Sequence, residues 1–410
     1  MNDVTPRRSV LNAAVIVAAL GYFVDIYDLI LFSVVRMSSL KSLGLSDVQL
    51  IDQGLLVINS QMAGMLLGGV LWGALGDKRG RLQTLFASIT LYSLATIANG
   101  FVQTVPQYAV LRFIAGIGLA GELGAGVTLV AEVLPTKVRG WGTMLVASVG
   151  VSGAVLANIV SRNFDWRTAY FIGGALGLGL LLLRIGVSES EIFRSTEQRM
   201  GVKRGNFLAL FATWERTRRY VKTVLIGTPT WYLVGILITL APEFAKAMGV
   251  TGAVTSGDAV MYAYLGLVVG DVASGTISQL VRSRKKVVIA FILLIMVSVA
   301  TFFTVPRDQS ATVMYASIFF IGVAAGYWAL FVTIGAEQFG TNLRATAATT
   351  VPNFARGALV PISAAFQLAK AQWGLIPGAA VVGAVTLLVA LVAAIGLDET
   401  FGRDLDYVEP

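Results

Sequence analysis

The sequence contains no cysteine and no histidine. The absence of cysteine excludes disulfide bonds and thiolate chemistry, and the two absences together remove the usual ligands of zinc and haem sites. Charge is also scarce, because only 13% of the 410 residues are Asp, Glu, Lys or Arg. Without histidine, Asp and Glu are the side chains best suited to exchange protons near neutral pH. Any proton carrier should therefore be a carboxyl group, and we expect no metal and no cofactor.

Apolar residues are in excess. They make up 56% of the chain, and the mean hydropathy is +0.76, whereas about 45 to 50% is usual for a soluble domain. Apolar runs of about 20 residues, the length that crosses a bilayer as a helix, alternate with short polar connections. The pattern predicts an all-α membrane protein. We place twelve transmembrane helices at 11–35, 54–75, 82–101, 107–132, 143–160, 169–187, 222–245, 259–281, 286–305, 311–334, 350–370 and 376–396.

The longest polar connection lies between the sixth and seventh predicted helices. It divides the chain into a bundle at 1–187, a cytoplasmic linker at 188–221 and a second bundle at 222–410. Most Lys and Arg residues fall at the termini and in the loops on the same side as this linker. By the positive-inside rule both termini are cytoplasmic, in a multi-pass protein of the inner membrane. The net charge of +8 then reflects topology and contact with anionic lipid, and we expect no nucleic-acid partner.

The two predicted bundles share a sequence repeat. AEVLPTKVR at Ala131–Arg139 and AEQFGTNLR at Ala336–Arg344 both follow the pattern A-E-x-x-x-T-x-x-R, at the cytoplasmic ends of the fourth and tenth helices. Duplicated six-helix halves are typical of transporters that rock one half against the other around a site between them. We expect Glu132 and Glu337, with Arg139 and Arg344, to form ion pairs that stabilise each half.

Two further segments resemble the major facilitator superfamily, and the similarity extends over essentially the whole chain. GALGDKRGRLQTL, from Gly73 to Leu85, is similar to the signature loop G-x-x-x-D-[RK]-x-G-R-[RK], with Leu82 at the last basic position. RFIAGIGLAGELGAG, which begins at Arg112, is similar to the R-x-x-x-G-x-G fourth helix. The resemblance implies two pseudo-symmetric six-helix bundles and alternating access. It also implies that the loop acts as a conformational latch. The latch residues are Gly73, Asp77, Arg79, Gly80 and Arg81.

The latch also has a physical basis. Asp77 ends a helix beside three basic residues, so it can pair with a cation or face the positive end of a helix dipole. Such contacts can form in one conformation and break in the other. The alternative is that the segment is only a tight, basic turn.

Two aspartates lie inside the first predicted helix, in the stretch GYFVDIYDLILFS. Asp25 and Asp28 are three residues apart, so their carboxylates share a helix face. A charged Asp at the bilayer centre costs about 2.5 to 3.5 kcal/mol, so two of them need a function or a partner. At 1.5 Å per residue, Arg112 of the fourth helix lies at a depth close to that of Asp28, and we expect the two to pair. Asp25 has no evident cation and either carries a proton or solute, or bonds to Asn59 or Gln61.

The first helix also resembles those of two subfamilies. DIYD is similar to the D-G-F-D of aromatic-acid:proton symporters, with Ile26 in place of Gly, and YDLILFS is similar to the Y-D-x-x-x-x-S of sugar porters. The sugar-porter resemblance makes Asp28 the proton acceptor and Arg112 its partner. A carboxylate that leaves its arginine in a dry site favours protonation, so making and breaking this pair would couple proton uptake to conformation. Glu122 is either a second relay carboxylate or a hydrogen-bonding group at a tight, glycine-rich helix interface.

Arg356 is the other arginine we place at membrane depth. With Asn353 it is our candidate for binding a carboxylate, since a guanidinium fork matches that geometry. The alternative is that Arg356 pairs with the cytoplasmic charges. Further candidates for the solute cavity are Gln61, Trp231, Tyr232, Tyr327 and Trp328, although aromatic residues also fill helix interfaces.

These observations predict a proton-coupled symporter of a small polar solute, most simply an organic anion, that works as a monomer. A carrier of cations or zwitterions and a proton-driven drug exporter are compatible with the same residues. A membrane sensor without transport would usually need an added soluble domain. An enzyme is not expected, because the polar loops are short and no Walker loop is present.

Overall fold

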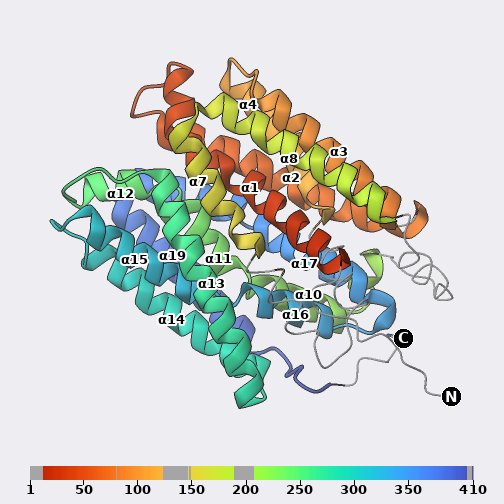
Figure 1. The fold of residues 1–410 in the computed structure, drawn as a ribbon. Helices are drawn as coiled ribbons and strands as arrows, with labels where there is room; N and C mark the ends of the chain where they lie inside the picture. Colours follow the sequence, from red (N-terminus) through yellow and green to blue (C-terminus); the bar gives the residue numbers. More distant parts are fainter. Residues whose placement is uncertain are drawn as a thin grey trace, which may run out of the picture.

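The computed structural model describes residues 13–79, 81–122, 146, 149–188, 207–403 and 409. Over these residues the chain is helical, and the one β-bridge joins Thr251 to Ser310 (Figure 1). Eight helical spans of the described part are long and apolar enough to cross a membrane. The all-α membrane class predicted from the sequence is therefore confirmed. Part of the predicted helix at 107–132, much of that at 143–160 and the start of the linker lie outside the described residues.

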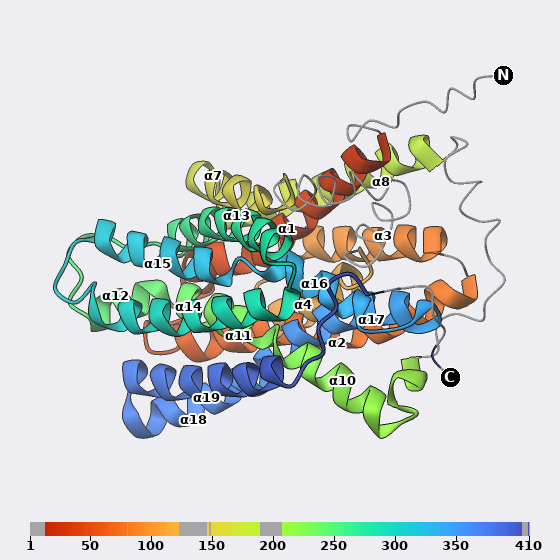
Figure 2. The ribbon, with the colours of Figure 1, turned by 90° about the horizontal axis from the view of Figure 1, so that it is seen from below.

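The helices form two groups, which Figure 1 shows one above the other and Figure 2 shows from below. The first group comprises α1 (Ala13–Ser42), α2 (Leu50–Arg79), α3 (Arg81–Asn99), α4 (Val105–Leu119), α7 (Gly153–Asn163) and α8 (Trp166–Ser188). The second comprises η1 (Phe207–Phe211), α10 (Trp214–Leu225), α11 (Thr228–Tyr232), η2 (Leu233–Ile238), α12 (Ala241–Ala247), α13 (Ser256–Val281), α14 (Arg284–Thr304), α15 (Ala311–Ala325), α16 (Trp328–Glu337), α17 (Thr341–Gly357), α18 (Leu359–Trp373) and α19 (Leu375–Ile395).

Within each group the helices pack mainly on one another. The two groups meet where α1 and α7 lie against α13, and where α2 lies against α17 and α18. The boundaries that we predicted for the two bundles and their linker stay a prediction. Residues 207–221, which we assigned to the polar linker, contain η1 and most of α10.

Three of the helices predicted in the second half of the chain are interrupted. The predicted helix at 222–245 consists of the end of α10, then α11, the π-helix η2 and α12. Pro229 and Pro242 stand in the first turns of α11 and α12, and each lacks the N–H that would continue the preceding helix. The Thr228 hydroxyl donates to the Leu225 carbonyl at 2.8 Å. Pro229 has no N–H and cannot donate to this carbonyl.

The other two interruptions lie at 311–334 and 350–370. The first is broken between α15 and α16, at Gly326 and Tyr327. The second begins at Thr341 and breaks at Ala358, three residues before Pro361. Arg356 therefore lies in the last turn of α17, beside a break, and not near the start of its helix as predicted.

Candidate functional site

An ion pair joins α1 to α4 in the interior of the first helix group. Arg112 Nη1 donates to Asp28 Oδ1 at 3.1 Å, and its Nη2 donates to the Asp28 backbone carbonyl at 2.8 Å. Both side chains are fully buried. The Gln61 side chain supports the pair, because its oxygen accepts from Arg112 Nε at 3.3 Å and its nitrogen donates to the Leu29 carbonyl at 3.1 Å. The contact expected between Asp28 and Arg112 is therefore present.

Asp28 keeps one free oxygen. Its Oδ2 is buried without a hydrogen-bond partner among the residues that the structure describes. A buried carboxylate oxygen without a donor is costly while the group is charged. The pair is therefore not saturated with hydrogen bonds, and Oδ2 can accept one more donor.

Asp25 belongs to a neighbouring cluster, although it lies only one helical turn from Asp28. Its carboxyl group is within electrostatic range of Glu122, and Glu122 forms an ion pair with Arg184 of α8. Asp25 is 6% exposed and Glu122 is 2% exposed. Both carboxyl groups thus lie in a dry interior, where a charge without a partner is costly.

Gly21 makes room for this cluster. A Cβ atom at position 21 would overlap the Arg184 guanidinium and would approach Glu122 Oε1 to 2.6 Å. Arg184 lies near the end of the sixth predicted helix and is not among the candidates drawn from the sequence. Its 7% exposure shows that it is an interior cation.

The second helix group contributes an arginine held between two indoles. The Arg356 guanidinium carbon lies 5.6 Å from the Trp231 ring centroid and 5.7 Å from that of Trp328. The two indoles meet edge to face, with centroids 5.9 Å apart. Arg356 Nη1 donates to Asn353 Oδ1 at 3.3 Å. The predicted pair of Arg356 and Asn353 is therefore brought together with Trp231 and Trp328, two of the other predicted candidates, by α11, α16 and α17.

This arginine is buried but not satisfied. Arg356 is 3% exposed, and its Nε and the Trp231 indole nitrogen have no hydrogen-bond partner within the described part of the chain. Asp25 of α1 is within electrostatic range of the Arg356 guanidinium. The Asn353 side chain donates to the Ala120 carbonyl at 3.0 Å, which ties α17 to the segment after α4. The arrangement offers donors and flat apolar faces at the junction of the two helix groups.

The remaining solute candidates lie elsewhere. The Tyr327 hydroxyl donates to the Ile226 carbonyl at 2.6 Å, and the Tyr232 hydroxyl donates to the Ala379 carbonyl at 2.8 Å. Both tyrosines thus fasten helices of the second group to one another. Gln61 is engaged by Arg112, and Asn59 accepts from the Ser363 hydroxyl at 2.8 Å. Neither amide is the partner of Asp25 that the alternative interpretation required, and we leave all four residues out of the solute site.

One membrane carboxylate was missed in the sequence. Asp271 lies in α13, and its Oδ1 accepts from the backbone N–H of Ala329 at 3.0 Å. The only available signal was a single acidic residue in an otherwise apolar run, which by itself does not identify a partner.

Polar contacts also join the two groups at the end of the molecule where α1 ends and α2 begins. Arg36 is fully buried and donates to both carboxylate oxygens of Glu243, at 2.6 and 2.7 Å. One turn earlier on α1, Ser33 accepts from the Thr239 hydroxyl at 3.0 Å. We call Ser33, Arg36, Thr239 and Glu243 the α1–α12 clasp. An ion pair of Arg162 with Asp258 and one of Lys370 with Asp52 connect the two groups as well.

The predicted latch lies at the other end, where α1 begins. Gly73 lies in α2, and a Cβ there would only touch Thr350 of α17, at 4.0 Å. The side chains of Asp77, Arg79 and Arg81, and the whole of Gly80, Glu132 and Arg139, lie outside the described residues.

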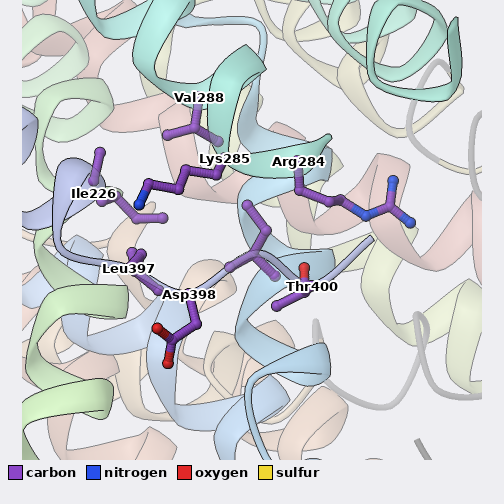
Figure 3. A pocket seen from close by; sticks show the side chains of 9 residues that line it. Ile226, Arg284, Lys285, Val288, Leu397, Asp398 and Thr400 are labelled. Atoms are coloured by element: carbon purple, nitrogen blue, oxygen red, sulfur yellow. The ribbon is translucent and has the colours of Figure 1, made fainter. Parts of the chain in front are cut away.

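The second copy of the repeat corrects one expectation. Glu337 pairs with Arg284 of α14, through two contacts of 3.0 Å, and also accepts from the Thr400 hydroxyl at 2.8 Å. Among the described residues the ion-pair partner of Glu337 is therefore Arg284 and not Arg344. Figure 3 shows a cavity next to this network, lined among others by Ile226, Arg284 and Thr400. Its volume of about 10 Å³ fits one water and no solute.

The comparisons with known proteins agree on the family. The model described as "Major Facilitator Superfamily" matches residues 14–364. The cis,cis-muconate transport protein of Acinetobacter baylyi is 25% identical over 94% of this chain and 94% of its own. The gentisate transporter of Corynebacterium glutamicum is 27% identical over 82% of this chain and 76% of its own.

A solved structure has the same fold. The crystal structure of a D-xylose-proton symporter superposes with a TM-score of 0.71 at 19% identity, over 97% of this chain and 100% of that one. A family match over most of the chain and a common fold over nearly all of it exclude an enzyme and agree with a multi-pass carrier of small solutes. The chain belongs to the major facilitator superfamily of membrane transporters.

Proposed function

We propose that this transporter is a symporter that moves one planar organic carboxylate together with one proton. The observation that carries the proposal is the buried Arg356 guanidinium, which stands between Trp231 and Trp328 with donor capacity to spare. We further propose that it acts as a monomer in the inner membrane with both termini cytoplasmic, because one chain supplies every residue of the site and the basic loops lie on that side.

The solute half of the proposal follows from chemistry. A guanidinium binds a carboxylate through parallel N–H donors, and a desolvated arginine makes such bonds strong. The indoles of Trp231 and Trp328 offer flat faces to a conjugated or aromatic solute, and the free Trp231 N–H can donate to a ring substituent. Muconate and gentisate, which give two relatives their names, are conjugated and aromatic carboxylates.

Charge balance supports the proton half. Asp28 is paired with Arg112, and Glu122 with Arg184. Within the described part of the chain, Asp25 and Arg356 are then central charges without an ion pair, as is Asp271, whose carboxylate accepts from a backbone N–H. Asp25 and Arg356 belong to different helix groups and lie within electrostatic range of each other. When a proton binds Asp25 and a carboxylate binds Arg356, the buried site stays neutral. Binding of either one alone leaves an uncompensated charge in a dry site, which is expensive.

This balance favours a carboxylate over the alternatives. Asp28 and Glu122 are engaged by arginines and Asp271 by a backbone N–H, so a cationic solute would have to use Asp25. It would then also meet the positive charge of Arg356, which lies within electrostatic range of Asp25. Asp28 and Arg112 keep a role in our proposal as a second coupling pair, in which Asp28 with its free oxygen takes the proton onward when the conformation changes.

Transport by purified protein in liposomes tests the proposal. With labelled benzoate as the probe, wild type should accumulate solute up to about tenfold for each pH unit across the membrane, as one proton per solute allows. An imposed membrane potential should leave this level unchanged, because a proton and a monoanion carry no net charge together. Liposomes that contain the Arg356→Ala variant are the control for passive entry of the solute. Arg356→Lys tests the need for the guanidinium fork, because it keeps the positive charge without the fork.

The proton carrier is tested separately. Asp25→Asn should keep solute exchange between equal pH values but lose accumulation driven by a pH difference. Accumulation by Asp25→Asn at the wild-type level would refute the assignment of the proton to Asp25. Asp28→Asn should lose proton-driven accumulation too, and accumulation that persists unaltered in that variant would remove Asp28 from coupling. A panel of acids, amines and sugars that compete with benzoate tests the solute class.

A further inference from the structure

The helix that carries Trp328 begins without a cap of its own. Each helix leaves its first four N–H groups without partners inside the helix, and a Ser, Thr, Asp or Asn at the N-cap usually accepts from one of them. The N-cap of α16 is Tyr327, which makes no side-chain cap. Its hydroxyl is instead bonded to the Ile226 carbonyl. In a membrane interior, where water is absent, these amides need another acceptor.

Asp271 supplies that acceptor from a different helix. Its Oδ1 accepts from Ala329 N at 3.0 Å, in the first turn of α16. Negative charge at a helix N-terminus is stabilised by the helix dipole. The Asp271 carboxylate, in the middle of the apolar helix α13, therefore caps a neighbouring helix. Asp25 and Asp28 have no such role in the described part of the chain.

Backbone packing holds Asp271 at the break. A Cβ at Gly270 would come within 2.8 Å of the Gly326 Cα, and one at Gly326 would come within 2.5 Å of the Asp271 backbone nitrogen. Helices without side chains at the crossing point approach closely. The chain turn between α15 and α16 therefore lies directly against α13, next to the aspartate.

The capped turn begins with Trp328, whose ring lies against Arg356. We propose that Asp271 is a positioning residue of the solute site: it caps α16 from α13 and thereby fixes the Trp328 indole against the Arg356 guanidinium. The inference rests on the proposed function for its effect on solutes, but the capping contact itself does not require any solute.

Hydrogen–deuterium exchange on the purified full-length protein in detergent tests the cap first. In Asp271→Leu, amide exchange in a peptide that covers Trp328 to Val332 should rise about fivefold, the equivalent of a lost cap. Asp271→Asn keeps an acceptor oxygen and should stay near wild type. Ser274→Ala, which changes a buried polar residue one turn further along α13, is the matched control. Unchanged exchange in Asp271→Leu would overturn the inference, whatever the transported solute is.

Solute discrimination tests the consequence. Benzoate and cyclohexanecarboxylate have similar size and the same charge, but only benzoate has a flat ring for Trp328. In Asp271→Leu the KM for benzoate should rise about fivefold relative to that for cyclohexanecarboxylate, whereas a loss of folded protein would lower both maximal rates and leave the KM ratio unchanged. An unchanged ratio would refute the positioning role.

A second variant covers a failure to fold. If Asp271→Leu does not fold, Asp271→Glu provides the test, because it moves the carboxylate by one methylene, and wild-type exchange in that variant would also contradict the inference. If no carboxylate binds even wild type, the proposed function fails, while the exchange experiment still decides the cap.

Discussion

The α1–α12 clasp allows a quantitative prediction for the end of the molecule where α1 ends and α2 begins. Arg36 is 0% exposed and its partner Glu243 is 15% exposed, and they belong to different helix groups. Removal of one partner of a buried ion pair costs about 3 to 5 kcal/mol, because the other charge is left without compensation. Arg36 keeps the Leu50 and Thr239 carbonyls, each at 3.2 Å, and Glu243 is partly hydrated, so we expect about 2 kcal/mol for Glu243→Gln.

Such a loss should raise the population that is open at this end about 30-fold, since 1.4 kcal/mol is a factor of ten. The absence of cysteine in the chain provides a clean assay. A single Ser33→Cys, at a site that is 2% exposed beneath Arg36, should react with a water-soluble maleimide only when the clasp opens. We expect its labelling rate to rise about 30-fold when Glu243→Gln is added, if opening is fast relative to labelling.

The control for this experiment is Glu215→Gln, which removes an 82%-exposed carboxylate paired with Arg219 along one helix. An exposed pair of this kind contributes at most a few tenths of a kcal/mol, so labelling of the introduced thiol should not change. A labelling rate that stays within twofold of the parent in Glu243→Gln would refute the reasoning, because the buried pair would then contribute nothing to closure.

Two further predictions concern the acidic pH range and the glycine beside Glu122. Burial acts to raise the pKa of Glu399, but hydrogen bonds from Ser283 and from backbone N–H groups outweigh it and hold the pKa below its ordinary value of 4.5. The ionised Glu399 carboxylate therefore stabilises the fold above the unfolded pKa, and this stabilisation is lost as the pH falls through the folded pKa. Below about pH 4.5 the drop in Tm should be smaller in Glu399→Gln than in wild type and in the control Asp398→Asn. Equal drops in all three proteins would contradict this prediction. Gly21→Ala should lower both Tm and proton-driven accumulation, because its Cβ would meet Glu122 Oε1 at 2.6 Å, whereas Gly179→Ala, where an added Cβ meets nothing within 4 Å, should be neutral or stabilising. A Gly21→Ala variant with wild-type transport would show that the Glu122 cluster tolerates displacement.

Much of the architecture could be predicted from the sequence because it depends on local properties. Apolar runs of bilayer length identify membrane helices whatever they pack against, since every backbone polar group in lipid must be satisfied within the helix. The breaks in these helices were less visible. Pro229, Pro242 and Pro361 mark three of them, but the break at Gly326 depends on its contact with Gly270, a residue of another helix.

The contacts of the candidate site could likewise be predicted only in part. The contact of Asp28 with Arg112 was predictable, because the rise per residue gives each side chain a depth, and few charges share that depth. Depth does not give direction around the helix axis or the neighbour that a helix meets. The sequence therefore left Asp25 without a partner and omitted Arg184 and Asp271.

By itself, then, the sequence determined that this chain is a helical membrane protein, and that any proton it carries must travel on a carboxyl group, because it contains no histidine and no cysteine. Only the tertiary structure decided which carboxyl groups are already engaged. It joins Glu122 to Arg184, gives Asp271 to the first turn of α16, and leaves Asp25 and Arg356 without an ion pair among the described residues. The physical reason is that burial makes every charge require a partner, and the partner is chosen by the packing of helices that are far apart in the sequence.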